Sequence, residues 1–239
     1  MNTYQLHLNV TKPIIAGRET AYHFSTATPF RLQDSHERKI HTIIVNNDLT
    51  FFAHIHPVEN GDSFSVHTTL PHGGPFWLFA DYVPEGQHQV INKFALEVEG
   101  DIPQPQVAFH PRLTAVSGEY KLELHLDHGP LHQGHAMFSA ELTKNGTHID
   151  PAQIDNYLGE KAHAVLIHQD SKAFVHVHPE VRNGRFVLHA ELPQEGIYRA
   201  WIQFKIHGIV HTTDFVLEAK AAQTGTSAHG HHHAHGHHH

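Results

Sequence analysis

The amino-acid sequence predicts an all-β protein that consists of two tandem antiparallel β-sandwich domains and a disordered His-rich tail. Two observations predict this fold: one segment occurs twice in the chain, and within each copy apolar residues alternate with polar ones. Alternation with a period of two is typical of strands that bury one face. A third observation is that no convincing 3.6-residue period occurs, apart from a short helical turn at 151–157.

The repeat consists of the segment His41–Pro57 and a second copy at His163–Pro179. The offset is 163 − 41 = 122 residues, and it stays constant as far as Gly86, which matches Gly208. Constant spacing over this length indicates a tandem duplication. We therefore divide the chain into a first domain at 1–100, a linker at 101–110, a second domain at 111–220 and a tail at 221–239.

Each copy contains strands that begin and end at turn residues. Ser63–Leu70 and Arg185–Leu192 alternate apolar and polar residues, and an Asn-Gly pair precedes each of them. Glycine-containing turns follow both segments. Short strands joined by such turns are typical of antiparallel sandwiches.

The composition excludes several classes of function. The 16 Lys and Arg residues are outnumbered by 24 Asp and Glu, and the resulting charge of −8 is opposite to the positive surface that binds nucleic acid. The absence of cysteine excludes disulfides, thiolate metal sites and blue-copper electron transfer. No apolar run approaches the ~18 residues of a membrane span, so we expect no insertion into a membrane.

Histidine is the unusual residue of this chain. Of 30 histidines, eight lie at 229–239, so 30 − 8 = 22 belong to the rest of the chain. The second copy carries the pattern His163-x12-His176-x-His178. A hairpin tip at Asp170-Ser171 pairs residues whose numbers sum to 341, which places His163 opposite His178 and Val165 opposite His176.

The three imidazoles of this pattern are expected on one face of the hairpin, because cross-strand partners and i, i+2 neighbours share a face. Their β-carbons then lie within ~4.5–8 Å of one another, which suits a metal ion about 2.0–2.1 Å from each nitrogen. A lone histidine more often bonds to a backbone carbonyl, but a repeated convergent triad favours a metal site. Val165, Ile167 and Phe174 share this face, so we expect the site at the end of a sandwich core.

The first copy has an equivalent triad, which consists of His41, His54 and His56. In the second copy we expect His211, on the last strand, as a fourth ligand. Gln89 matches His211 in the first copy, with His88 beside it and Asp81 upstream as candidate ligands. This difference predicts either two sites of unequal affinity or one working site and one relic.

A further group of histidines occurs only in the second copy and consists of His125, His128, His132 and His135. A Gly-Pro turn lies among them, and a loop that folds back there would bring several imidazoles together at a surface ion site. The tail is interrupted by small residues, which favours a natural metal-scavenging segment over an addition made for purification. Its candidate ligands include His231, His233 and His235.

Four segments resemble a group of bacterial tandem β-sandwich proteins of the cupredoxin-like or YtkA- or FixH-like type, which are associated with heavy-metal and especially copper handling. The segments are 48–57, 79–86, 157–163 and 203–212. The resemblance implies sandwiches of the cupredoxin-like or immunoglobulin-like type and a partner such as a metal transporter or a cuproprotein. It also implies a periplasmic or other extracytoplasmic location. No signal peptide follows Met1, so we expect a cytoplasmic location if Met1 is the native start.

We expect a protein that sequesters or delivers Cu(II) or Zn(II) and carries no catalytic residues. Ni(II) is a further candidate, because imidazole sets suit all three ions. One alternative is a cupin-like metal-dependent oxygenase, since Pro84–Asn92 comes within one residue of the second cupin motif. The other is an adhesion-like structural sandwich with incidental histidines.

Overall fold

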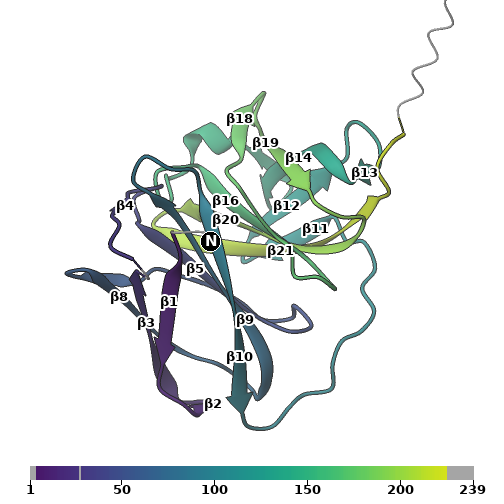
Figure 1. The fold of residues 1–239 in the computed structure, drawn as a ribbon. Coiled ribbons are helices and arrows are strands. Elements are labelled where there is room, and N and C mark those ends of the chain that lie inside the picture. The colour runs from purple at the N-terminus through teal and green to yellow at the C-terminus, as the bar shows by residue number, and fades with distance from the viewer. Residues whose placement is uncertain (1–3, 27, 225–239) are drawn as a thin grey trace, which may run out of the picture.

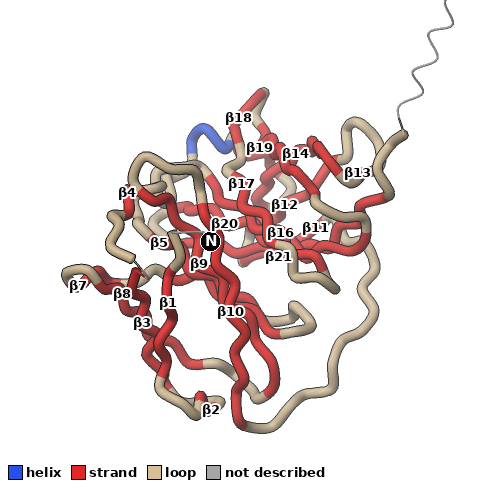
Figure 2. The backbone as a smooth tube through the Cα atoms, viewed as in Figure 1, coloured by secondary structure: helices blue, strands red, loops and turns tan. Residues whose placement is uncertain are grey.

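The computed structural model describes residues 4–26 and 28–224. They form two β-sandwiches, and the first, purple to blue in Figure 1, lies against the second, teal to yellow. Figure 2 shows strands throughout both sandwiches, with one short helix in the described residues, η1 (Pro151–Gln153). The all-β fold predicted from the sequence is confirmed. This helix is too short to cross a membrane, and no other described segment forms a membrane-spanning helix.

The first sandwich consists of two sheets. One has the strand order β1 (Leu6–Val10), β3 (Glu19–Thr26), β8 (Ser63–Thr69) and β7 (Val58–Asn60). The other has the order β2 (Ile14–Ile15), β10 (Val90–Glu99), β9 (Gly74–Pro84), β5 (Ile40–Asn46) and β6 (Phe52–Ile55), with β4 (Leu32–Gln33) paired to β9.

The second sandwich repeats this plan. One sheet has the order β11 (Thr114–Ser117), β12 (Tyr120–His125), β14 (Gly134–Lys144), β19 (Arg185–Leu192) and β18 (Glu180–Arg182), with β15 (Thr147–Ile149) paired to β14. The other has the order β13 (Leu131–His132), β21 (Ile209–Lys220), β20 (Gly196–Ile206), β16 (Ala162–His168) and β17 (Phe174–Val177). Between the two sandwiches, residues 101–110 form an exposed loop without strands along the side of the molecule (Figure 1).

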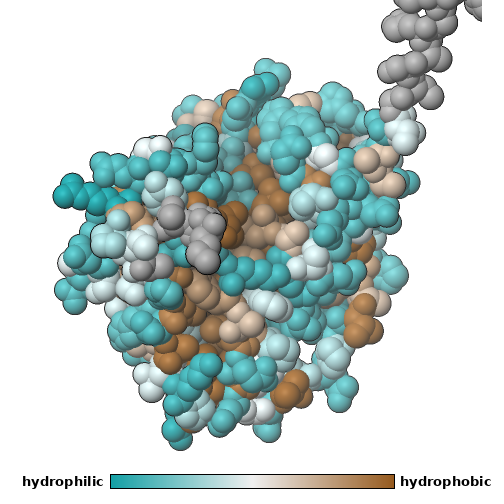
Figure 3. Space-filling view, in the orientation of Figure 1, coloured by the Kyte–Doolittle hydropathy of each residue, from teal (hydrophilic) through white to brown (hydrophobic). Residues whose placement is uncertain are grey.

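Each sandwich has its own apolar core between its two sheets. Phe24 and Phe76 lie in the first core, and Phe138 and Phe204 in the second. Strand β8 shows how the alternating sequence produces this arrangement, because Phe64 and Val66 are buried while their neighbours Ser63, Ser65 and His67 are more exposed. Figure 3 shows the consequence for one face of the molecule: it is mostly hydrophilic, with hydrophobic residues in patches near its middle.

A third apolar cluster lies between the two sandwiches. Phe52 stacks on Trp201 with ring centroids 4.5 Å apart, and Phe174 stacks on Phe79 at 4.9 Å. These contacts are reciprocal under the sequence offset, since 52 + 122 = 174 and 79 + 122 = 201. Equivalent residues of the two copies thus exchange roles across the interface, as in an isologous dimer.

The interface explains why β5 and β16 are buried along their whole length. One face of each strand packs in its own sandwich, and the other packs against the neighbouring sandwich. The predicted hairpin register is confirmed, with Val165 paired to His176. The expectation that the site lies at the end of a sandwich core is wrong, because Val165, Ile167 and Phe174 belong to the cluster between the domains.

Candidate metal centre

The first triad lies where strands β5 and β6 face the second sandwich. One nitrogen from each of His41, His54 and His56 lies within 4.8 Å of the other two. The Nδ1 atom of His41 is 3.3 Å from the Nε2 atoms of both His54 and His56. An ion bound tetrahedrally at about 2.0–2.1 Å separates its ligand atoms by about 3.3–3.4 Å, so these nitrogens already stand at a coordination spacing.

The second triad has the same arrangement on β16 and β17. One nitrogen from each of His163, His176 and His178 lies within 4.8 Å of the others. Among the described residues, Nδ1 of His163 and the Nε2 atoms of His176 and His178 are buried without a hydrogen-bond partner. Buried polar atoms are nearly always paired in folded proteins, so three convergent unpaired nitrogens fit a bound cation.

Backbone carbonyls fix the tautomer of the first histidine in each triad. The Nε2 group of His41 donates to the carbonyl oxygen of Ser35 at 2.9 Å, and that of His163 donates to Tyr157 at 2.8 Å. Because a carbonyl can only accept, the proton resides on Nε2. The lone pair of Nδ1 is then directed into the triad.

The second histidine of each triad is oriented by the other domain. His54 Nδ1 donates to Oε1 of Gln203 at 2.7 Å, and His176 Nδ1 donates to Oδ2 of Asp81 at 2.6 Å. Both acceptors are buried, with Asp81 3% exposed and Gln203 8%. Hydrogen bonds of this kind fix ring orientation and leave Nε2 as the ligand atom.

The two triads form a single cluster of imidazoles. Within the triads, ring centroids are 4.6–5.8 Å apart. Between the triads, four centroid separations are 5.6–6.4 Å. Two ions bound here would therefore be close neighbours at the domain interface.

His36, in the loop before β5, was not singled out from the sequence. Its ring centroid is 3.6 Å from that of His178, and its Nδ1 atom is 3.3 Å from Oε1 of Glu160. The repeat contains no signal for it, because the equivalent position is Leu158. His36 covers the second triad from the first domain.

Burial keeps the triad imidazoles neutral. It lowers the pKa values of His54, His163 and His176 to about 3 and those of His56 and His178 to about 2, and it also lowers the pKa of His41. The neighbouring imidazoles add to this shift. Burial raises the pKa of Asp81 to about 6. At neutral pH the site therefore presents neutral imidazoles, the form that binds metal.

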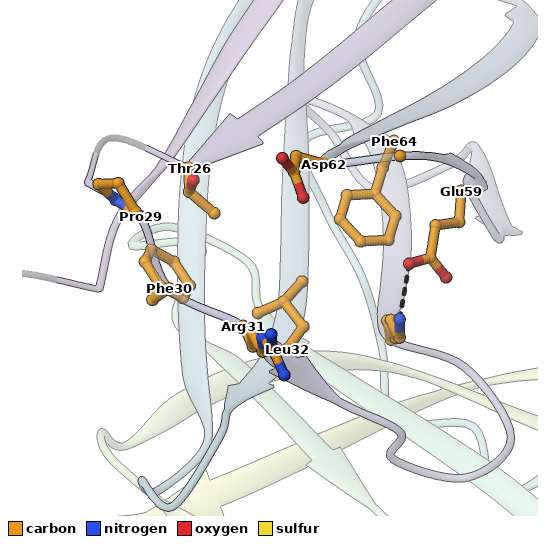
Figure 4. Close-up of a pocket in the computed structure, with 10 residues that line it drawn as sticks. Thr26, Pro29, Phe30, Arg31, Leu32, Glu59, Asp62 and Phe64 are labelled. Atoms are coloured by element: carbon orange, nitrogen blue, oxygen red, sulfur yellow. Dashed lines mark hydrogen bonds and ion pairs between the residues drawn. The ribbon is translucent and has the colours of Figure 1, made fainter.

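Solvent reaches the first triad through a hollow of about 360 Å³ that His56 lines. Lys39, Glu59 and Phe64 line this hollow and also a neighbouring one of about 670 Å³. Figure 4 shows the larger hollow with the Lys39–Glu59 ion pair, 2.6 Å, at its edge. An ion therefore has a route to the first triad from this side.

His211 is not a fourth ligand. Strand pairing places it opposite Phe204, and its ring stacks on Phe204 at 5.3 Å, on the core side of the sheet. Gln203, on the triad side, pairs instead with Thr212. The alignment with Gln89 fails because the hairpin is one residue shorter in the second copy: Asp81 pairs with Ile91, so 91 − 81 = 10, whereas 212 − 203 = 9. A one-residue slip reverses the face of every later side chain.

The candidate fourth ligands of the first copy also lie elsewhere. His88 is exposed in the loop between β9 and β10. Asp81 is not one of the three grouped residues of that triad, and its carboxylate accepts from His176 of the second triad and from Gln89 Nε2 at 2.7 Å. It orients a ligand of the other domain instead of binding beside His41.

The histidines at 125–135 do not converge on one site. His125 lies 3.4 Å from Glu141, His132 Nδ1 donates to the carbonyl of Ala221, and His135 Nδ1 lies 2.9 Å from Glu191. His128 is exposed. The loop does not fold back as expected, because β13 and β14 hold His132 and His135 in separate pairings. The tail candidates His231, His233 and His235 lie outside the described residues.

Several solved structures are distantly similar to this chain. Fibronectin(III)-like modules of Clostridium thermocellum CbhA are 11% identical, with a TM-score of 0.26, and the match covers 97% of this chain and 100% of that one. A Ca²⁺-stabilised adhesin with which an Antarctic bacterium binds ice is 12% identical, with a TM-score of 0.29 over 94% and 50% of the two chains. Escherichia coli alpha-2-macroglobulin is 11% identical, with a TM-score of 0.31 over 93% and 22%. The chain thus spans half or less of the length of the latter two.

Comparison by sequence gives one family. None of the proteins of curated function that were compared with this chain matches it. The family model described as a domain of unknown function, DUF8832, matches residues 1–100 and 105–221. The matched ranges cover both sandwiches, and the chain belongs to the DUF8832 family.

Proposed function

We propose that this protein sequesters or delivers a divalent transition metal ion, Cu(II) or Zn(II), in the two triads at its domain interface. The observation that carries the proposal is the direction of the lone pairs. In each triad, two imidazoles donate from one ring nitrogen to a backbone or side-chain oxygen outside the triad. The other ring nitrogen of each, called the inner nitrogen, faces the third imidazole. The residues present fit an ion with three nitrogen ligands.

A purely structural role explains this arrangement poorly. In the second triad three inward nitrogens are buried without a hydrogen-bond partner among the described residues, and each such atom costs about 1–3 kcal/mol. A metal ion removes this cost, and the surrounding aromatic interface keeps the ligands in place. Carbonyl-bonded core histidines alone give no reason for the second nitrogens to converge.

The ligand set indicates which ions are suitable. Neutral imidazoles bind Zn(II), Cu(II) and Ni(II), and Cu(II) binds most tightly in open competition. Three protein ligands leave a coordination position for water or for a ligand of an acceptor protein. Transfer to a metal transporter or cuproprotein outside the cytoplasm is consistent with this open position and belongs to the same proposal.

The oxygenase alternative has less support. Cupin-like sites combine histidines with a carboxylate ligand, and neither group of convergent ligands in the described residues contains one. The buried carboxylate nearby, Asp81, bonds to the outer nitrogen of His176. We therefore propose binding and transfer of the ion as the function.

Metal titration tests this proposal. The protein used is the full chain in which the eight histidines of 229–239 are replaced by serine, called the tail-substituted chain below. Calorimetry with Zn(II) and Cu(II) should show two ions bound per chain. The variant His41→Ala with His163→Ala should lose both, whereas the matched control His67→Ala with His128→Ala, two exposed positions, should retain both. Equal binding by the two double variants would overturn the proposal.

A further inference from the structure

We infer that Asp81, a residue of the first domain, is the positioning residue that makes the triad of the second domain the tighter metal site. The inference rests on the proposed function and adds an order of occupancy to it. The second triad fills first, and the first triad, which opens to solvent through the hollow beside His56, holds the more weakly bound ion.

The repeat places Asp81 and Gln203 in equivalent positions, since 81 + 122 = 203. Each is the strand neighbour of the first histidine of its own triad, Asp81 beside His41 and Gln203 beside His163. Each nevertheless bonds to the middle histidine of the opposite triad. Asp81 and Gln203, the two supports, therefore each reach across the interface. They occupy equivalent positions of the repeat but have different side chains.

Both supports are themselves held in place. The second oxygen of Asp81 accepts from Gln89, and the amide nitrogen of Gln203 donates to Oγ1 of Thr212 at 2.9 Å. The two acceptors are thus similarly buried and similarly oriented. The remaining difference is charge, because Asp81 is a carboxylate and Gln203 is a neutral amide.

This charge difference favours the second triad. A carboxylate on the outer nitrogen makes an imidazole a stronger ligand, and such partners typically change metal affinity by 10–100-fold. Asp81 is the only buried carboxylate among the described residues, and its charge offsets that of an ion in the second triad. The hollow beside His56 is lined by charged residues of both signs, none of them buried, and so provides the first triad with no comparable buried carboxylate: Arg38, Lys39, Asp34, Glu37 and Glu59.

Two single-site proteins separate the affinities. In the tail-substituted chain, His56→Ala leaves only the second triad complete, and His178→Ala leaves only the first. Titration with Zn(II) against a chelator of known affinity should give 10–100-fold tighter binding in the His56→Ala protein. Asp81→Asn should weaken that protein by 10–100-fold and change the His178→Ala protein by less than about 3-fold.

The reciprocal variant is the matched control. Gln203→Glu keeps the side-chain length and should strengthen Zn(II) binding in the His178→Ala protein, a gain that a merely structural role for this position would not produce. Equal affinities of the two single-site proteins, or an equal loss in both on Asp81→Asn, would overturn the inference while leaving the proposed function intact. The absence of Zn(II) binding in both proteins would instead contradict the proposed function.

Discussion

The metal-free protein should lose stability steeply as the pH falls below about 6.5, because the triad imidazoles resist protonation only when folded. His163 illustrates the sign. Its pKa is about 6.5 in the unfolded chain and about 3 in the folded one. Between these values the unfolded state binds the proton and the folded state does not, so acidification favours unfolding. The loss begins near pH 6.5 and ends near pH 3.

The magnitude follows from the two pKa values. Between pH 7 and pH 5, one such imidazole lowers the free energy of unfolding by about 2 kcal/mol. Burial shifts the pKa of Asp81 upward, to about 6, so this carboxyl changes stability in the opposite direction over part of the range. A comparison between wild type and a variant that lacks one imidazole removes this contribution, because Asp81 is present in both.

Urea denaturation of the tail-substituted chain with a chelator present measures the effect. His163→Asn should lose about 2 kcal/mol less than wild type between pH 7 and pH 5. The control His128→Asn, at an exposed position, should lose as much as wild type. The reasoning is refuted if His163→Asn and wild type show the same pH dependence.

Three further predictions concern the interface, the protons and the tail. Trp201→Ala removes a buried ring that stacks on Phe52 and should lower the free energy of unfolding by about 3–5 kcal/mol in the same denaturation assay. The control Val210→Ala, at an exposed position, should change the free energy of unfolding by less than about 0.5 kcal/mol. Zn(II) binding at pH 7.5 should release almost no protons from the triads, so the calorimetric enthalpy should not vary among buffers of different ionisation heat; a clear variation would show that the ligands were protonated. Replacing the eight tail histidines should reduce the number of weakly bound ions in equilibrium dialysis and leave the tight class unchanged. A site whose residues must be ordered by the ion loses about 1–2 kcal/mol of binding free energy per residue ordered.

The parts of the site that depend on local pairing could be predicted from the sequence. Asp170-Ser171 at the hairpin tip predicts the pairing of Val165 with His176, and this pairing is present. Once the register is known, the shared face of His163, His176 and His178 follows from strand geometry. The constant offset then transfers the same triad to the first domain.

The parts that depend on the packing of the two domains could not be predicted in this way. Asp81 and His176 are 95 residues apart and belong to different sandwiches, and nothing in their local sequence relates them. The apolar runs in β5 and β16 did carry a signal, because strands buried on both faces are apolar without alternation. The face of His211 was missed because the alignment was extended across a hairpin whose length differs between the copies.

Anomalous diffraction from crystals of the tail-substituted chain loaded with Zn(II) shows whether the inward nitrogens of the triads bind a metal ion. An anomalous peak is expected about 2.0–2.1 Å from Nδ1 of His163 and from the Nε2 atoms of His176 and His178. A second, weaker peak is expected in the triad of His41. Zinc peaks confined to surface histidines, with both triads empty at saturating Zn(II), would show that the triads do not bind the ion.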